Sequence, residues 1–199
     1  IMEPQIMDME HRKEWRIQSN YESIAAMTEA YQKCVCYRDI MTVQTEDTLC
    51  RCEDRKFRVR VYIPGKRKTY PVVIFYHGGA FSMNSIEVYE YVHRYLSYYG
   101  DMIVVAPDYH LAPEYKFPKG LEEAYSTLVW TEENIKGYGG DPADISVCGD
   151  SSGGNFAASV SMMARDRKGP AISRQILYYP LVTNIEEEMT DSEKRYGKG

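Results

Sequence analysis

The chain has 199 residues, enough for a single domain with one sizeable core. Hydrophobic residues make up 44% and charged residues 27%, which is typical of a water-soluble globular domain. The formal net charge of -5 lacks the basic excess that nucleic-acid binding requires, and no apolar run is long enough for a membrane span.

Five cysteines and a charged N-terminal segment without an apolar leader predict reduced thiols in the cytoplasm. Four of the cysteines form two closely spaced pairs, Cys34/Cys36 and Cys50/Cys52, and the fifth is Cys148. Four thiolates suit zinc, but a single intervening residue is not the usual zinc spacing. The spacing favours ordinary half-buried thiols, with zinc as the alternative, and we predict no metal in the functional site.

Residues 9–31 are predicted to form an amphipathic helix. Six side chains recur near one face at helical spacing: Trp15, Tyr21, Ile24, Ala25, Thr28 and Tyr31. We expect residues 1–45 to form a helical arm packed over a core at residues 46–199, with a partner-binding helix as the alternative.

The next two apolar runs, 49–53 and 57–63, are predicted to pair as antiparallel strands joined at Asp54-Arg55. The second run alternates in polarity, which is typical of a strand at the edge of a sheet. Two sets of side chains are expected on opposite faces: Val59, Val61 and Ile63 on one, Arg58, Arg60 and Tyr62 on the other.

The rest of the chain alternates strands with helices, which predicts an α/β fold. Continuous apolar runs indicate the buried strands of a mostly parallel sheet: 71–76, 102–106, 145–148 and 175–179. The intervening helical segments are 85–99, 118–134 and 151–165. Such connections cover both faces of a parallel sheet with helices.

The stretch His77-Gly78-Gly79-Ala80-Phe81 directly follows the 71–76 strand. Two glycines at the carboxyl end of a strand let the backbone approach a ligand closely, and their N–H groups can aim at one point. Loops of this type supply half of the oxyanion hole in lipases and esterases. The alternative is a plain strand-end turn. We expect His77 to orient the loop by hydrogen bonds instead of acting as a base.

The stretch Gly149-Asp150-Ser151-Ser152-Gly153 lies between the 145–148 strand and the 151–165 helix. A serine in a G-x-S-x-G turn exposes its Oγ, and the residues two positions to either side must be small because the turn is tight. The helix N-terminus adds free N–H groups where an oxyanion could form. Ser151 is therefore the predicted nucleophile, with an inert Gly/Ser-rich loop as the alternative.

Three further motifs stand between these two: Asp108-Tyr109-His110-Leu111-Ala112-Pro113-Glu114, Phe117-Pro118 and Gly139-Gly140-Asp141-Pro142. In this order, the five motifs resemble the hormone-sensitive-lipase-like family of α/β-hydrolases, in its bacterial carboxylesterase branch, over residues 46–180. The resemblance implies an α/β-hydrolase fold. It also implies a small-molecule ester substrate, with short acyl chains, and no cofactor.

The resemblance assigns the site residue by residue. Ser151 matches the nucleophile, and three backbone N–H groups match the oxyanion hole: those of Gly78, Gly79 and Ser152. The supporting residues are His77, Asp108, Glu114 and Asp150, among which Asp108 and Glu114 match positions that brace the loops. His110 stands where the family usually has arginine, so a bracing ion pair there is in question. Ala80 replaces a glycine that many members have, and keeps its N–H.

In α/β-hydrolases an acid and then a histidine follow the nucleophile along the chain. All four histidines precede Ser151: His11, His77, His93 and His110. The acids after it lie at no identifiable strand end: Asp166, Glu186, Glu187, Glu188, Asp191 and Glu193. We therefore expect an α/β-hydrolase core that is incomplete at its carboxyl end and lacks the triad acid and base.

Two hypotheses follow. In the first, the full-length parent is a serine hydrolase of carboxylic esters that forms an acyl-enzyme on Ser151; lipase, amidase and deacetylase activities stay open. In the second, the chain is a non-catalytic fragment or binding module. A sheet edge left open after the 175–179 strand also predicts homo-oligomers or aggregates.

Overall fold

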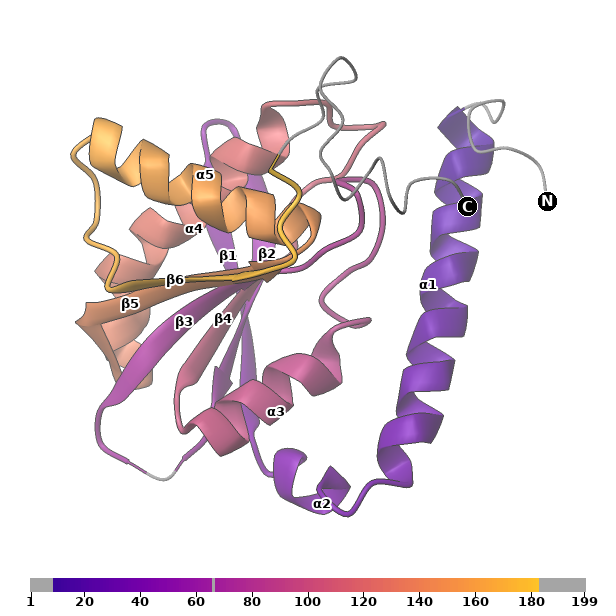
Figure 1. The fold of residues 1–199 in the computed structure, drawn as a ribbon, viewed down its shortest axis with the longest axis horizontal. Helices are drawn as coiled ribbons and strands as arrows, with labels where there is room; N and C mark the ends of the chain where they lie inside the picture. The colour runs from indigo at the N-terminus through magenta and orange to yellow at the C-terminus, as the bar shows by residue number, and fades with distance from the viewer. Residues whose placement is uncertain (1–8, 66, 183–199) are drawn as a thin grey trace, which may run out of the picture.

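The computed structural model describes residues 9–65 and 67–182 (Figure 1). The strands are β1 Gln44–Cys52, β2 Arg55–Ile63, β3 Tyr70–Tyr76, β4 Ile103–Pro107, β5 Gly140–Asp150 and β6 Arg174–Tyr178. The helices are α1 Met9–Gln32, α2 Tyr37–Ile40, α3 Glu90–Gly100, α4 Lys119–Asn134, the 3-10 helix η1 Ile135–Tyr138 and α5 Ser152–Asp166. Within these described ranges, no helix has the length and apolar character needed to cross a bilayer.

The six strands form one sheet in the order β1-β2-β4-β3-β5-β6. Strands β4, β3, β5 and β6 pair in parallel, whereas β2 pairs antiparallel with both β1 and β4. The predicted α/β fold, with a mostly parallel sheet and an antiparallel edge, is confirmed. The carboxyl ends of β3 and β5 are neighbours, since Tyr76 lies opposite Gly149.

Helices cover both faces of this sheet (Figure 1). Alternate residues of β3 enter two cores: Val72 and Ile74 pack with α4 and α5, while Val73 and Phe75 belong to the core that α3 covers. Because both faces of β3 are buried, its sequence is apolar throughout instead of alternating. The same reasoning predicted β4 to within one residue, but only the middle of β5, which runs from Gly140 to Asp150 instead of 145–148.

Several predicted boundaries differ from the structure. The first hairpin turns at Glu53-Asp54, so Arg55 already belongs to β2, and α3 begins at Glu90 instead of residue 85. The predicted alternation in β2 is confirmed, since Val59 and Val61 lie in one core and Tyr62 lies in the core on the other face. The Tyr62 ring is fully buried under α3, and its hydroxyl donates a 2.7 Å hydrogen bond to Glu90. A tyrosine can occupy such a site because its polar tip finds a partner.

Helix α1 stands beside the body of the molecule as an arm (Figure 1). The prediction that all six side chains of one face pack against the core is wrong for Trp15 and Tyr21, which are 48% and 68% exposed. The end nearer the core is placed as predicted: Tyr31 stacks on Tyr91 at 4.7 Å between ring centroids, and Thr28 accepts a hydrogen bond from the Tyr91 hydroxyl. The arm thus meets the body along a narrow stripe, too narrow to cover every aromatic on the helix.

The other end of the arm is held by one arginine. The Arg16 guanidinium donates to both carboxylate oxygens of Glu114, at 3.0 and 2.6 Å, and to the carbonyl oxygen of Ala112 at 3.2 Å. The Arg16 side chain is only 16% exposed. A bidentate, partly buried pair of this kind is stronger than an exposed surface pair.

We expect Arg16→Ala to free the first turns of α1 from the body. Limited proteolysis within α1 should then become at least about fivefold faster, because the substitution removes the charge-assisted hydrogen bonds that hold this end. Lys33→Ala is the control, since the ion pair between Lys33 and Glu29 lies within the arm and both side chains are 72% exposed. Equal rates of proteolysis for the wild-type and Arg16→Ala chains would show that Arg16 does not hold this end of α1.

Strand β6 forms one edge of the described sheet, and its side chains Ile176 and Tyr178 are 39% and 46% exposed. An exposed edge with apolar side chains invites pairing with another chain. The expected oligomerisation through this edge stays a prediction. Residues 183–199 of the assigned core, including the acids from Glu186 onward, and residues 1–8 of the arm lie outside the described residues.

Candidate active site

Ser151 lies in a sharp turn between β5 and α5, with φ 52° and ψ −117°. A non-glycine residue in such a conformation costs on the order of 1–3 kcal/mol, so its surroundings must enforce it. Its N–H donates to the Tyr178 carbonyl at 3.0 Å, and its own carbonyl accepts from the N–H groups of Asn155 and Leu181. The backbone on both sides of Ser151 is therefore fixed.

The two glycines of the turn are required by close backbone contacts. A Cβ on Gly149 would collide with the backbone of Gly153, directly across the turn. A Cβ on Gly153 would collide with the carbonyls of Tyr76 and His77. Small residues are thus required for two reasons. The turn closes on itself at Gly149, and at Gly153 the start of α5 packs directly against the end of β3.

His77 is buried and belongs to its own loop. Its ring stacks on Tyr109 at 4.4 Å, and its Nδ1–H donates to the Gly78 carbonyl at 2.8 Å. The Tyr109 hydroxyl donates to the carbonyl of His77 at 2.6 Å. Burial lowers the pKa of His77, which favours the neutral imidazole. This arrangement matches the expected orienting role.

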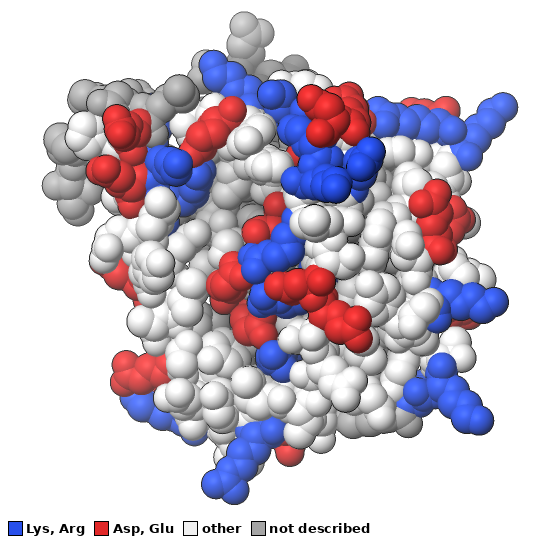
Figure 2. Space-filling model, turned by 180° about the vertical axis from the view of Figure 1, so that it is seen from behind, with Lys and Arg blue, Asp and Glu red and all other residues white. Residues whose placement is uncertain are grey.

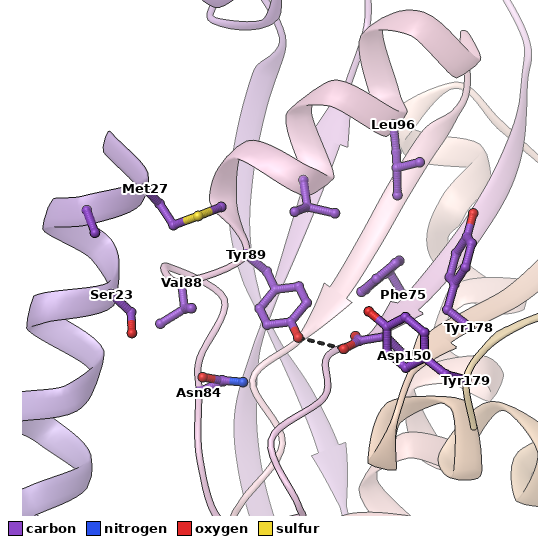
Figure 3. A pocket seen from close by; sticks show the side chains of 12 residues that line it. Ser23, Met27, Phe75, Asn84, Val88, Tyr89, Leu96, Asp150, Tyr178 and Tyr179 are labelled. Atoms are coloured by element: carbon purple, nitrogen blue, oxygen red, sulfur yellow. Dashed lines mark hydrogen bonds between the residues drawn. The ribbon is translucent and has the colours of Figure 1, made fainter. Parts of the chain in front are cut away.

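Asp150 connects the loop at residues 77–81 to the turn at residues 149–153, here called the elbow, and to the start of helix α3. Its Oδ1 accepts the Gly78 N–H at 2.9 Å, and its Oδ2 accepts the Tyr89 hydroxyl at 2.8 Å (Figure 3). The Gly78 N–H is therefore bonded to Asp150 in this structure, and its role in an oxyanion hole stays a prediction. The next two N–H groups, of Gly79 and Ala80, have no hydrogen-bond acceptor within the described part of the chain.

Ser152 contributes more than a backbone N–H. Its hydroxyl accepts a hydrogen bond from the Phe81 N–H at 3.3 Å, and the residue is completely buried. Ala80 and Phe81 both have positive φ, 51° and 60°, so this part of the loop is tightly curved. Sequence reasoning assigned only the backbone N–H of Ser152 to the site. The signal it missed was a hydroxyl placed one residue after the predicted nucleophile.

Comparison with known proteins agrees with this geometry. Residues 73–199 match the family described as having the α/β hydrolase fold. The chain belongs to the α/β-hydrolases, in their hormone-sensitive-lipase-like branch.

The hydrolase has curated relatives that are esterases. It is 43% identical over 123 residues to carboxylesterase NlhH of Mycobacterium tuberculosis, covering 61% of this chain and 39% of that protein. It is 36% identical over 156 residues to an arylesterase of Saccharolobus solfataricus, covering 78% of this chain and 50% of that protein. The chain thus spans half or less of the length of these relatives. The family to which the chain belongs thus contains carboxylesterases.

Solved esterases share the fold of the hydrolase. EstE1, a thermostable carboxylesterase from a metagenomic library, superposes with a TM-score of 0.83 at 38% identity, over 94% of this chain and 61% of that one. The esterase of Pyrobaculum calidifontis superposes with a TM-score of 0.85 at 34% identity, over 100% of this chain and 59% of that one.

The two predicted bracing acids hold loops, and neither bonds Ser151 within the part of the chain that the structure describes. Asp108 pairs with Arg58 at 2.8 Å, and Glu114 pairs with Arg16 of the arm. The bracing contact questioned at His110 is present: its Nδ1 lies 2.7 Å from the fully buried Glu123 carboxylate, which also accepts the His110 N–H. Acidic and basic side chains alternate in this way across the back of the molecule (Figure 2).

One cavity borders the nucleophile turn at Asp150, and a second lies beside the first turns of α5. The arm-side cavity, about 670 Å³, lies between α1, α3 and the end of β6, and Tyr89, Asp150 and Tyr179 line it (Figure 3). The inner cavity, about 470 Å³, is lined by the loop residues Ala80 and Phe81, by α5, and by residues from 110 to 121. Both cavities fall in the size range of small-molecule sites.

The cysteine pairs lie away from the elbow. Cys50 and Cys52 are buried, and burial raises the pKa of Cys50 to about 12, so its thiol stays protonated. Cys34 and Cys36 lie at the surface after α1. Within residues 9–65 and 67–182, no three His, Cys, Asp or Glu side chains are grouped so as to hold a metal.

Proposed function

We propose that this hydrolase cleaves carboxylic esters with short acyl chains through an acyl-enzyme on Ser151. The observation that carries the proposal is the strained turn at Ser151, next to N–H groups without a partner in the described chain. Strain of this kind persists only where the surroundings enforce it, and it concentrates at active sites. The esterase relatives support the same reaction class.

In the proposed reaction the Ser151 oxygen attacks the ester carbonyl carbon, and the carbonyl electrons move onto its oxygen. The N–H groups of Gly79, Ala80 and Ser152 then stabilise that oxyanion. Collapse releases the alcohol, which takes up the proton from Ser151, and leaves an acyl-serine. Water attacks the acyl-serine in the second step and releases the acid.

The general base of this reaction is not among the described residues. No hydrogen bond joins the Ser151 Oγ to an imidazole within residues 9–65 and 67–182. His77 is enclosed in its loop, and burial lowers the pKa of His93 to about 3. We propose that a histidine from a longer gene product takes the Ser151 proton.

The second candidate function is a binding module without catalysis, favoured by the same lack of a base near Ser151.

We also propose that the protein works in a reducing compartment such as the cytoplasm, which its five free cysteines support. The exposure of Trp15 and Tyr21 is compatible with an arm that acts as part of a cap.

Labelling by a fluorophosphonate probe distinguishes the two candidates. We expect the 199-residue chain to label slowly, since an unassisted serine hydroxyl is a weak nucleophile. The full-length gene product should label quickly and hydrolyse short p-nitrophenyl esters, and Ser151→Ala should remove both activities. Rapid labelling of the 199-residue chain would show that a residue within it activates Ser151. A full-length product that neither labels nor hydrolyses would favour the binding module.

A further inference from the structure

We propose that Asn84 is a positioning residue for the oxyanion: its side-chain amide fixes the direction in which the Gly79 N–H points. Asn84 lies in none of the five sequence motifs. The inference rests on the proposed function of Ser151 and adds how the same site controls one of its proposed oxyanion donors.

The Gly78 carbonyl is held by two donors. The Asn84 side-chain Nδ2–H donates to it at 3.0 Å, and the His77 Nδ1–H donates to it at 2.8 Å. This carbonyl and the Gly79 N–H belong to one planar trans peptide group, so they point in opposite directions. The two bonds that fix the carbonyl therefore also fix the direction of the Gly79 N–H.

Such a restraint is needed because this peptide group joins two glycines. Gly79 has φ 126°, in the region that side chains other than glycine rarely adopt. A peptide group between two glycines rotates with little steric resistance, and rotation would turn the Gly79 N–H away from an oxyanion. The Gly78 N–H is held by Asp150 at 2.9 Å, so the Gly78 carbonyl is the end that Asn84 controls.

The loop folds Asn84 back toward this carbonyl. The Gly79 carbonyl accepts the N–H groups of Ser82 and Met83 at 3.0 and 2.8 Å, which closes a tight turn just before Asn84. Asn84 has φ 73°, a left-handed conformation that asparagine tolerates better than most residues. A Cβ added to Gly79 would lie 2.9 Å from the Asn84 Nδ2, so the amide packs directly against the peptide group.

The side chain of Asn84 can be changed without disturbing either core. It is half-buried and belongs to neither hydrophobic cluster. It lines the arm-side cavity near Tyr89 and Asp150 (Figure 3). Substitution at this position should therefore affect the loop more than the fold.

The hydrogen bonds to the Gly78 carbonyl also strengthen the donor. A carbonyl that accepts hydrogen bonds polarises its peptide group, and the N–H of that group then donates more strongly. Negative charge develops on the substrate oxygen mainly in the transition state. A stronger and better aligned Gly79 N–H should therefore raise kcat more than it lowers KM.

The test is hydrolysis of p-nitrophenyl butanoate by the full-length gene product and its Asn84→Gly variant. Glycine keeps φ 73° without strain, so the substitution removes the amide and leaves the backbone conformation. Loss of a whole oxyanion donor lowers kcat by about 10²–10³-fold. A misdirected Gly79 N–H should lower kcat by about 10- to 100-fold and change KM less than about threefold.

Asn134→Gly is the matched control. Its side-chain amide also donates to a backbone carbonyl, that of Trp130, but in the exposed last turn of α4. Both kinetic constants of this variant should stay within about twofold of wild type.

Butaneboronic acid gives a second measurement, because its tetrahedral adduct with a nucleophilic serine mimics the transition state and places an oxygen at the oxyanion position. For Asn84→Gly, its inhibition constant should rise by about the same factor as kcat/KM falls.

Asn84→Asp is the second variant, since it keeps the shape of the side chain but its ionised carboxylate cannot donate to the Gly78 carbonyl. Its kcat/KM relative to wild type at the same pH should rise as the pH falls, because the protonated carboxyl group regains an O–H donor. Structural damage to the loop would not be reversed by protonation.

A folded Asn84→Gly variant with wild-type kcat overturns the positioning role, and so does a lowered kcat with an unchanged inhibition constant for butaneboronic acid. If Asn84→Gly does not fold, Asn84→Asp decides, and a ratio to wild type that does not rise at low pH overturns the inference. Hydrolysis that requires Ser151 but not Asn84 overturns the positioning role alone. A gene product that hydrolyses no ester overturns the proposed function as well.

Discussion

Ser151→Ala and Ser151→Gly are both expected to lower kcat for ester hydrolysis by about 10⁴-fold or more in the full-length gene product. Each substitution removes the oxygen that forms the acyl-enzyme, so the residual rate would come from the oxyanion donors and substrate binding alone. Steady-state hydrolysis of p-nitrophenyl butanoate measures the loss. A Ser151→Ala protein with more than about a tenth of wild-type kcat would contradict Ser151 as the nucleophile.

The same pair of variants separates chemistry from backbone strain. At φ 52°, alanine keeps the backbone strain that serine has, whereas glycine relieves about 1–3 kcal/mol of that strain. Glycine also lowers stability by up to about 1 kcal/mol, because it gives the unfolded chain more conformational freedom. Ser151→Gly should therefore be more stable than Ser151→Ala by about 1 kcal/mol in urea unfolding. Equal free energies of unfolding would mean that the turn stores no strain.

Gly153→Ala is expected to destabilise the fold by about 3 kcal/mol or more. The added Cβ would collide with the carbonyl oxygens of Tyr76 and His77, and backbone atoms at the end of a buried strand cannot move aside cheaply. Gly137→Ala is the matched control. A Cβ there meets nothing within 4 Å, so this variant should be as stable as wild type or slightly more so. Urea unfolding of both variants measures the difference.

A Gly153→Ala protein within about 1 kcal/mol of the control would mean that β3 and α5 can separate without loss of packing. The glycines of the elbow would then be required only by the tightness of the turn, and not by the packing of α5 against β3. Activity gives a second measurement, since movement of α5 away from β3 should also displace the Ser152 N–H from the oxyanion position.

Sequence reasoning predicted the sheet because buried parallel strands are apolar on both faces, as in β3, and this signal is local. It failed on α1, where the aromatic spacing of Trp15 and Tyr21 suggested a packed face. Spacing shows which side chains share a face but not how much protein lies opposite. At Tyr62 the alternation gave the correct face, but not the burial of that face under α3.

In the site, the glycine motifs indicated the chemistry but not the assignment of individual donors. Gly78 and Gly79 are equivalent in sequence, and only the position of the Asp150 carboxylate shows that the Gly78 N–H is occupied. Likewise, the buried Glu123 that bonds the histidine at position 110 lies on the next helix, α4, 13 residues along the chain. Hydrogen bonds between separate elements leave no pattern in the local sequence, so these partners could be identified only from the structure.

The two hydrogen bonds between the loop and the elbow have a consequence for how this region opens. Gly78 bonds Asp150 and Phe81 bonds Ser152, so the loop is attached to the residues on either side of the nucleophile. Neither segment can unfold locally without breaking both bonds. Residues 77–81 and 149–152 should therefore exchange their amide hydrogens as one cooperative unit, in which the nucleophile and its oxyanion donors form and disappear together.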